Sequence, residues 1–163
     1  MTTQKRTTVS LSGRILYLTE DAQQLQGQLY QGQTLPFDPS RKLIDNISTD
    51  ELTPGWVCYY YDETLARYCL VGLRGGHIKQ DAIKNGNFSV IVSGVSKGCG
   101  SSRETAPYSE LKAGIQLVIA KNIEKIYGQN CQNVGLLTST DFSLISRIER
   151  GEAISIRSEE HTS

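Results

Sequence analysis

The sequence lacks the features that would place it in a membrane, on nucleic acid or outside the cell. No apolar run approaches the roughly 20 residues that a membrane-spanning helix needs. The 17 basic and 17 acidic side chains cancel, whereas a nucleic-acid-binding domain usually carries a basic face. The first eight residues lack the apolar core of a secretion signal. We therefore expect a cytoplasmic protein with neither a membrane nor a nucleic-acid partner.

Cysteines are few and widely spaced. Cys58, Cys69, Cys99 and Cys131 form no Cys-x-x-Cys pair, which is the usual arrangement of zinc ligands. An even count is compatible with two disulfides, but a chain of this size without a signal peptide more often keeps its thiols reduced. We therefore expect no metal bound by this chain. Cys99, beside a predicted helix start, is either a reactive thiol or a packing residue.

Linkers, repeats and low-complexity tracts are also absent, and the 163 residues suit one domain. Hydrophobic periodicity predicts a regular alternation of strands and helices in the second half, an order that favours a parallel α/β sheet. We expect residues 1–8 and 156–163 to be frayed. The predicted strands are 9–17, 27–34, 88–93, 115–120 and 136–138, and the predicted helices are 62–73, 78–85, 105–113, 122–133 and 143–150.

A glycine-rich loop between the predicted strand 88–93 and the next helix is the candidate active centre. It reads Lys97-Gly98-Cys99-Gly100-Ser101-Ser102-Arg103-Glu104. Backbone N–H groups and the positive end of a helix dipole make such a place suitable for anions. Two hydroxyls and a guanidinium add an acid/base group and a carboxylate clamp. The simpler alternative is a turn in which Ser101 or Ser102 caps the helix.

Two known motifs are excluded by the order of residues in this loop. A P-loop needs its lysine after the glycines, whereas Lys97 precedes them. A nucleophile elbow needs glycine two residues after the serine, where this chain has Arg103.

Three segments together resemble the small-subunit or swivel domain of the aconitase superfamily, which includes aconitase, homoaconitase and isopropylmalate isomerase. They occur in the family's order and spacing and cover about residues 43–140. The resemblance implies an α/β fold, a three-layer β/β/α swivel domain with a mixed, partly parallel sheet, as one domain over residues 1–163. The matching segments are 98–104 with Ala106, then 45–54, and then 114–127 followed by Asn130, Asn133 and 135–137.

The resemblance implies a hydro-lyase that moves a hydroxyl between neighbouring carbons of a small di- or tricarboxylate by dehydration and rehydration. It places the base, a serine alkoxide, at Ser101, and carboxylate binding at Ser102, Arg103 and the Gly100 backbone. Loop N–H groups, the helix dipole and the nearby guanidinium all favour the alkoxide.

Two further residues are candidates for the same site. Asp50 is similar to a family aspartate that supports the active site, although Thr49-Asp50 could equally form a turn or a helix cap. Arg74 is either another substrate-binding carboxylate clamp or a solvated loop arginine.

The resemblance also implies a cofactor and a partner outside this chain. Family enzymes use a four-iron, four-sulfur cluster as a Lewis acid, held by three cysteines of the large subunit or domain. Nothing in this sequence matches those cysteines. We therefore expect no cofactor bound here, a large iron–sulfur subunit as partner, and a chain that is folded but inactive alone.

One segment departs from the family. Residues 55–61 contain one tryptophan and three tyrosines but no arginine, where relatives carry an arginine that helps select the substrate. These aromatics either pack under a neighbouring domain or line the site for an unusual substrate. Two other interpretations stay open: a non-catalytic carboxylate- or phosphate-binding regulatory module, and an excised C-terminal domain of a longer aconitase-like enzyme.

Overall fold

The computed structural model describes residues 4–53, 64–100 and 104–159. None of the helices in these ranges combines the length and apolarity that crossing a membrane requires. The elements, in chain order, are β1 (Gln4–Val9), β2 (Arg14–Tyr17), α1 (Ala22–Tyr30), α2 (Thr49–Leu52), α3 (Thr64–Arg67), α4 (Ala82–Asn85), β3 (Phe88–Ser93), α5 (Thr105–Lys112), β4 (Leu117–Ala120), α6 (Lys125–Val134), β5 (Leu137–Ser139), α7 (Ser143–Glu149) and β6 (Ile154–Glu159).

Four strands form one parallel sheet in the order β2-β3-β4-β5, whereas β1 and β6 form a separate antiparallel pair. The sequence prediction of an α/β fold with a partly parallel sheet is therefore confirmed. Strand β3 is buried along its whole length, as expected for a central parallel strand covered on both faces.

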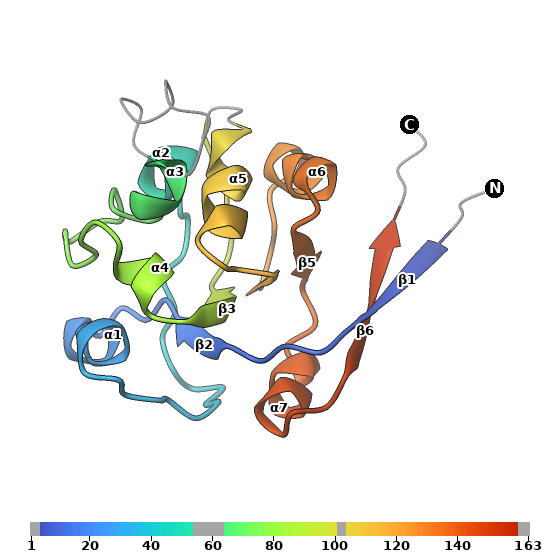
Figure 1. Ribbon diagram of the computed structural model, residues 1–163, viewed down its shortest axis with the longest axis horizontal. Coiled ribbons are helices and arrows are strands. Elements are labelled where there is room, and N and C mark those ends of the chain that lie inside the picture. The colour runs from blue at the N-terminus through green and yellow to red at the C-terminus, as the bar shows by residue number, and fades with distance from the viewer. Residues whose placement is uncertain (1–3, 54–63, 101–103, 160–163) are drawn as a thin grey trace.

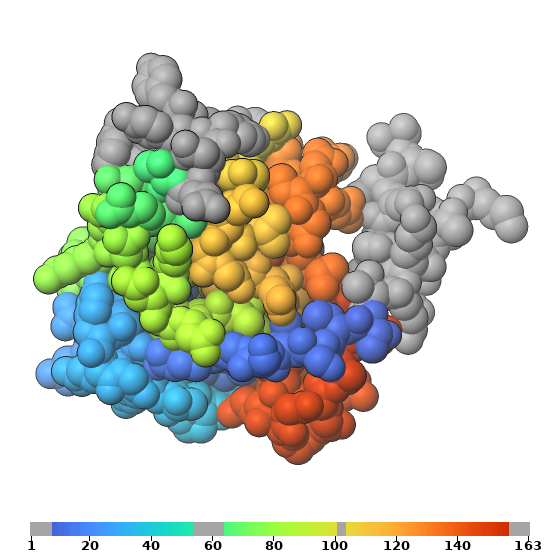
Figure 2. Space-filling view, viewed as in Figure 1, coloured from blue at the N-terminus to red at the C-terminus, as the bar shows by residue number. Residues whose placement is uncertain are grey.

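Alternation along the strands divides the core into two clusters, one on each face of the sheet. Leu16, Ile91 and Val118 point into the cluster that α1–α6 cover. The neighbouring positions Val92 and Ile119 point into the other, which α7 and β6 complete. Figure 1 shows α2–α6 gathered above the sheet and α7 below it. In Figure 2 the blue segment after β1 lies along the red α7, consistent with the packing of Val9 and Leu11 against this second cluster.

The strand predicted for residues 27–34 is wrong, because residues 22–30 form helix α1. Asp21 caps this helix by accepting from two backbone N–H groups, and Leu25 and Leu29, four residues apart, bury the same face. Between them Gln28 is fully buried, and its amide bonds both the N–H and the carbonyl of Tyr17.

Several other boundaries differ from the sequence prediction. The predicted strand 9–17 is divided, because β1 ends at Val9 and β2 begins at Arg14, and the predicted helix 78–85 is helical only over Ala82–Asn85. Within the predicted helix 62–73 the described residues are helical only over Thr64–Arg67, and Leu70 has a positive φ of 62° that an α-helix does not allow. Residues predicted to fray instead pair as β1 and β6, in register from Gln4 with Glu159 to Val9 with Ile154.

Candidate active site

The glycine-rich loop leaves the carboxyl end of β3, the edge at which ligands of parallel α/β sheets bind. Its first residues run alongside the segment that leads into α2. Gly94 lies so close to this segment that a Cβ there would be 3.0 Å from the Ile44 carbonyl oxygen. Five backbone hydrogen bonds join the two segments: Gly94 N to Ile44 O (3.0 Å), Asn46 N to Val95 O (2.7 Å), Gly98 N to Ile47 O (2.7 Å), Cys99 N to Ile47 O (3.2 Å) and Thr49 N to Cys99 O (2.9 Å).

The loop is joined equally closely to the segment between β4 and α6. The Lys97 N–H donates to the Asn122 carbonyl at 3.0 Å, and the Glu124 N–H donates to the Lys97 carbonyl at 3.0 Å. The three segments that carry the sequence resemblance therefore meet around residues 97–99, although they are far apart along the chain.

Of the loop residues 97–104, the structure describes 97–100 and Glu104. Gly100 is exposed, has a φ of +99°, and a Cβ there would be 3.7 Å from Thr49 Oγ1. Ser101, Ser102 and Arg103 lie outside the described residues. Helix α5 takes Glu104 as its N-cap and has Pro107 in its first turn. The simpler alternative for the loop, capping of this helix by Ser101 or Ser102, falls on residues outside the described ranges.

Asp50 lies in α2, next to the loop and exposed at the surface. Ser48 is the N-cap of this short helix: its hydroxyl accepts from Glu51 N at 3.1 Å, while its own N–H donates to Glu51 Oε1 at 3.1 Å. Gly72 packs against the other side, where a Cβ would be 2.8 Å from the Asp50 carbonyl oxygen. The position of Asp50 is thus fixed by a capping box rather than by a turn or cap of its own.

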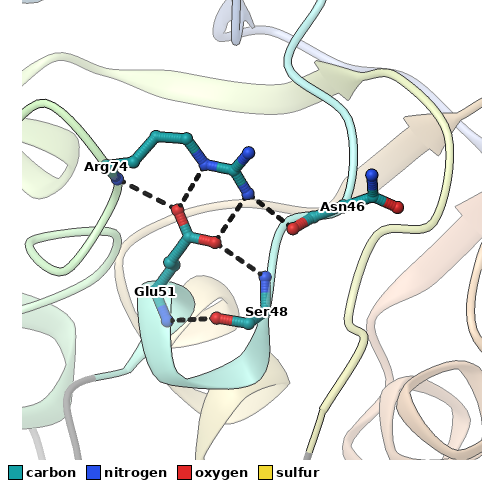
Figure 3. A network of polar contacts seen from close by, with 4 residues as sticks. All are labelled: Asn46, Ser48, Glu51 and Arg74. Carbon is teal, nitrogen blue, oxygen red and sulfur yellow. Dashed lines mark hydrogen bonds and ion pairs between the residues drawn. The ribbon is translucent and has the colours of Figure 1, made fainter.

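Arg74 and Glu51 form a polar network beside this helix (Figure 3). The guanidinium donates to both carboxylate oxygens, Nε to Oε2 at 2.9 Å and Nη2 to Oε1 at 2.8 Å. The Arg74 N–H also donates to Oε2, and Nη2 reaches the Asn46 carbonyl. A planar guanidinium held at two points has a fixed orientation, so Arg74 does act as a carboxylate clamp, toward a carboxylate of its own chain.

The network shifts the pKa values of both partners. Partial burial of Glu51 raises its pKa, but the hydrogen bonds from Arg74 and Ser48 outweigh this and lower it from 4.5 to about 2. The hydrogen bond to Glu51 raises the pKa of Arg74, against a smaller opposing effect of partial burial. Arg74 is linked to the segment that enters the loop, because it donates to the Asn46 carbonyl and the Asn46 N–H donates to the Val95 carbonyl.

The described residues do not fit a metal or iron–sulfur centre. No group of three or more His, Cys, Asp or Glu side chains comes together in the described part of the chain. Cys69 and Cys131 are buried, and burial raises the pKa of both thiols, that of Cys131 to about 12. Metal binding requires the thiolate, which these environments disfavour.

Sequence reasoning missed the contacts of four polar residues in and around the loop: Glu51, Lys97, Glu110 and Tyr127. Glu51 had a signal, because Ser48-x-x-Glu51 has the spacing of a capping box. The other three form a buried network that had no local signal.

Comparison with known proteins finds similarity over a large part of this chain. The profile described as the Aconitase C-terminal domain matches residues 77–141. The 3-isopropylmalate dehydratase small subunit of Syntrophus aciditrophicus (strain SB) is 34% identical over 116 residues, which are 71% of this chain and 68% of that protein. The small subunit of Endomicrobium trichonymphae is 35% identical over 116 residues, 71% of this chain and 69% of that protein.

A longer protein and a solved structure extend the comparison. Aconitase AMT8 of Alternaria alternata is 35% identical over 119 residues, 71% of this chain but 14% of that protein. The crystal structure of 3-isopropylmalate dehydratase from Methanocaldococcus jannaschii has 27% identity and a TM-score of 0.50, covering 72% of this chain and 77% of that chain. The domain therefore occurs both as a separate chain and within a larger one.

Proposed function

We propose a function that proceeds from one premise: this chain belongs to the aconitase superfamily, in the family of 3-isopropylmalate dehydratase small subunits. It works as the small subunit of an aconitase-type hydro-lyase, whose substrate is a small hydroxy-carboxylate such as 3-isopropylmalate. The observation that carries the proposal is the convergence of three segments on the loop at the carboxyl end of β3.

In the proposed reaction, Ser101 as an alkoxide removes a proton from the carbon next to a substrate carboxylate. The hydroxyl leaves the neighbouring carbon as hydroxide, the C–H and C–O bonds break, and a C=C bond forms. The proton taken up by Ser101 passes to the departing hydroxide, so that water is lost and the alkoxide is regenerated. Re-addition of water in the other orientation completes the isomerisation. A hydroxyl is a weak base in water, but inward-facing backbone N–H groups and cationic side chains favour its anion.

The remaining site residues would bind and orient the carboxylates. We assign this role to Ser102, Arg103 and the Gly100 N–H, with Asp50 supporting the site from α2. Arg74 is an outer carboxylate contact in this proposal. Because Glu51 already neutralises part of its charge, it would contribute orientation more than attraction.

Substrate binding is completed by a partner in this proposal. A separate large subunit would carry the four-iron, four-sulfur cluster, since the described residues of this chain offer no ligand set. Residues 55–61, which lack the family arginine, would face that subunit or the substrate. They lie outside the described residues.

Reconstitution with the cognate large subunit tests the base. Ser101→Ala should lower kcat for dehydration of 3-isopropylmalate by about 10²–10⁴-fold, the usual contribution of a positioned base, and leave assembly intact on size-exclusion chromatography. Ser93→Ala is the matched control, because its buried hydroxyl lacks a hydrogen-bond partner among the described residues. It should keep full activity. Undiminished turnover in Ser101→Ala would exclude Ser101 as the base.

Titration calorimetry of the isolated chain separates the proposal from a binding module. A small-subunit function predicts weak binding of 3-isopropylmalate by this chain alone, because most of the pocket belongs to the partner. Tight binding of citrate, 3-isopropylmalate or phosphate without a partner would favour the non-catalytic module instead.

A further inference from the structure

Three polar side chains are buried directly behind the glycine-rich loop. Lys97 and Glu110 are 0% exposed and Tyr127 is 1% exposed. The Lys97 ammonium donates to Glu110 Oε2 at 2.8 Å and to the Tyr127 hydroxyl at 2.6 Å. The same hydroxyl donates to Glu110 Oε1. The three groups therefore form a closed triangle of hydrogen bonds, which we call the buried triad.

The triad links the two ends of the segment that carries Ser101. Lys97 starts the loop four residues before Ser101, and its backbone is fixed to residues 122 and 124. Glu110 lies in α5, which begins just after the loop. Tyr127 lies in α6, and its ring is so close to Gly98 that a Cβ there would be 2.2 Å from Tyr127 Cγ.

The surroundings of the triad are apolar. Tyr127, Cys69 and Cys131 belong to the main core cluster. Burial raises the pKa of Tyr127 well above 10.0, so its phenol stays protonated and keeps donating to Glu110. The charges of both Glu110 and Lys97 influence the thiols of Cys69 and Cys131.

A buried ion pair is a weak source of stability. Desolvation of both charges offsets most of their attraction, and well-packed apolar residues of similar volume often stabilise as much or more. The triad contributes a defined geometry. Charge-assisted hydrogen bonds fix the relative positions of the groups that they join, whereas apolar side chains can shift against one another. Here that geometry connects the loop start to the two helices beside it.

We propose that Lys97, Glu110 and Tyr127 are positioning residues that set the geometry of the loop carrying Ser101. The expected effect of these residues on turnover rests on the proposed function. Their expected effect on the conformation of the loop does not depend on that function.

Cys99 provides a probe of the loop in the isolated chain. It is partly buried, whereas Cys69 and Cys131 are buried, and Cys58 can be removed by Cys58→Ser. Thiol alkylation depends on access and on thiolate character. The alkylation rate of Cys99 by iodoacetamide therefore reports the loop without any partner or substrate.

The decisive variant replaces both charges with apolar side chains, Lys97→Met with Glu110→Leu. We expect circular dichroism and the unfolding midpoint to stay close to those of the parent protein. The Cys99 alkylation rate should rise about tenfold as the loop opens locally. In the reconstituted complex kcat should fall about 10²-fold, the effect of a roughly 1 Å misplacement, with KM nearly unchanged.

Two further variants keep the test decisive. Tyr127→Phe retains the ring against Gly98 and removes the shared hydroxyl. It should also raise the Cys99 alkylation rate and lower kcat. If the double variant fails to fold, this single variant tests the inference. Lys112→Met, also in the Cys58→Ser background, removes an exposed lysine of α5 and should change neither readout. A folded triad variant with parental Cys99 and kcat values would overturn the inference. An inactive parental complex would refute the proposed function alone.

Discussion

Glu51 is the side chain that joins the α2 segment of the site to the turn that carries Arg74. Its carboxylate accepts from Arg74, which follows α3, and from the backbone N–H of Ser48, which caps α2. Its side chain is 16% exposed, whereas that of Arg74 is 52% exposed. The pair therefore contributes more than a fully solvated ion pair but is partly screened by water.

The low pKa of Glu51 predicts a specific dependence of stability on pH. Its folded pKa of about 2 lies below the ordinary value of 4.5, so the network stabilises the fold above pH 4.5 and loses this contribution as pH falls toward 2. After a discount for screening, Glu51→Gln should lower the free energy of unfolding by about 1–2 kcal/mol at neutral pH. Urea unfolding from neutral to acidic pH should show this difference shrinking.

The matched control for Glu51 is an exposed ion pair. Glu152 and Arg150 have side chains that are 44% and 63% exposed, so Glu152→Gln should change stability by less than about 0.5 kcal/mol. A difference between Glu51→Gln and the parent protein that stays constant down to pH 3 would contradict the assignment of the low pKa.

Single residues also show where sequence reasoning ends. Ser48-x-x-Glu51 and Gly98-Cys99-Gly100 can be recognised locally, because caps and tight turns depend on near neighbours. The buried triad cannot, since Lys97 pairs with residues 13 and 30 positions away. Lysine and glutamate are almost never fully buried without a partner, so without that pairing both would be assigned to the surface.

Within the loop itself, Gly98 is the position with the least freedom. Its φ is +90°, and a Cβ would fall 2.2 Å from Tyr127 Cγ and 2.3 Å from Tyr127 Cβ. Gly98→Ala should therefore combine backbone strain with displacement of α6, a loss of about 3 kcal/mol or more. Chemical denaturation of the isolated chain measures this loss.

Gly32→Ala isolates the backbone part of that effect. Gly32 has a φ of +66° with no heavy atom within 4 Å of an added Cβ, so only about 1–2 kcal/mol should be lost. Equal losses in the two variants would show that the contact between Gly98 and Tyr127 adds no constraint.

The strands and helices that sequence predicts best are those with the strongest local signals. Strand β3, with residues Phe88–Ser93, and helices α5 and α7 match closely, because apolar runs or helical spacing are bounded there by turn residues. The second half of helix α1 was predicted as a strand, because its Gln-rich sequence hides the pair Leu25 and Leu29. Strand β6 was missed because its partner β1 is at the opposite end of the chain.

The pairing of β1 with β6 bears on the whole molecule, because it brings the two ends of the chain together outside the main sheet (Figure 1). Ile154 and Ile156 are buried in the second core cluster, so this end of the ladder is anchored to the body. An isolated pair of strands is only marginally stable in water. The pairing toward the Gln4–Glu159 end therefore depends on this anchor.

Hydrogen exchange should therefore be graded along the ladder. Amides of β3 and β4, which are buried along their length, should exchange only on global unfolding. Protection in the β1–β6 pair should fall from the Val9–Ile154 end toward the Gln4–Glu159 end. Hydrogen exchange followed by mass spectrometry measures the protection of each strand.

Ile156→Ala, which removes packing from the anchor, should speed exchange in β1 more than in β3. Uniform protection along the ladder, equal to that of β3, would show that β1 and β6 unfold only together with the parallel sheet.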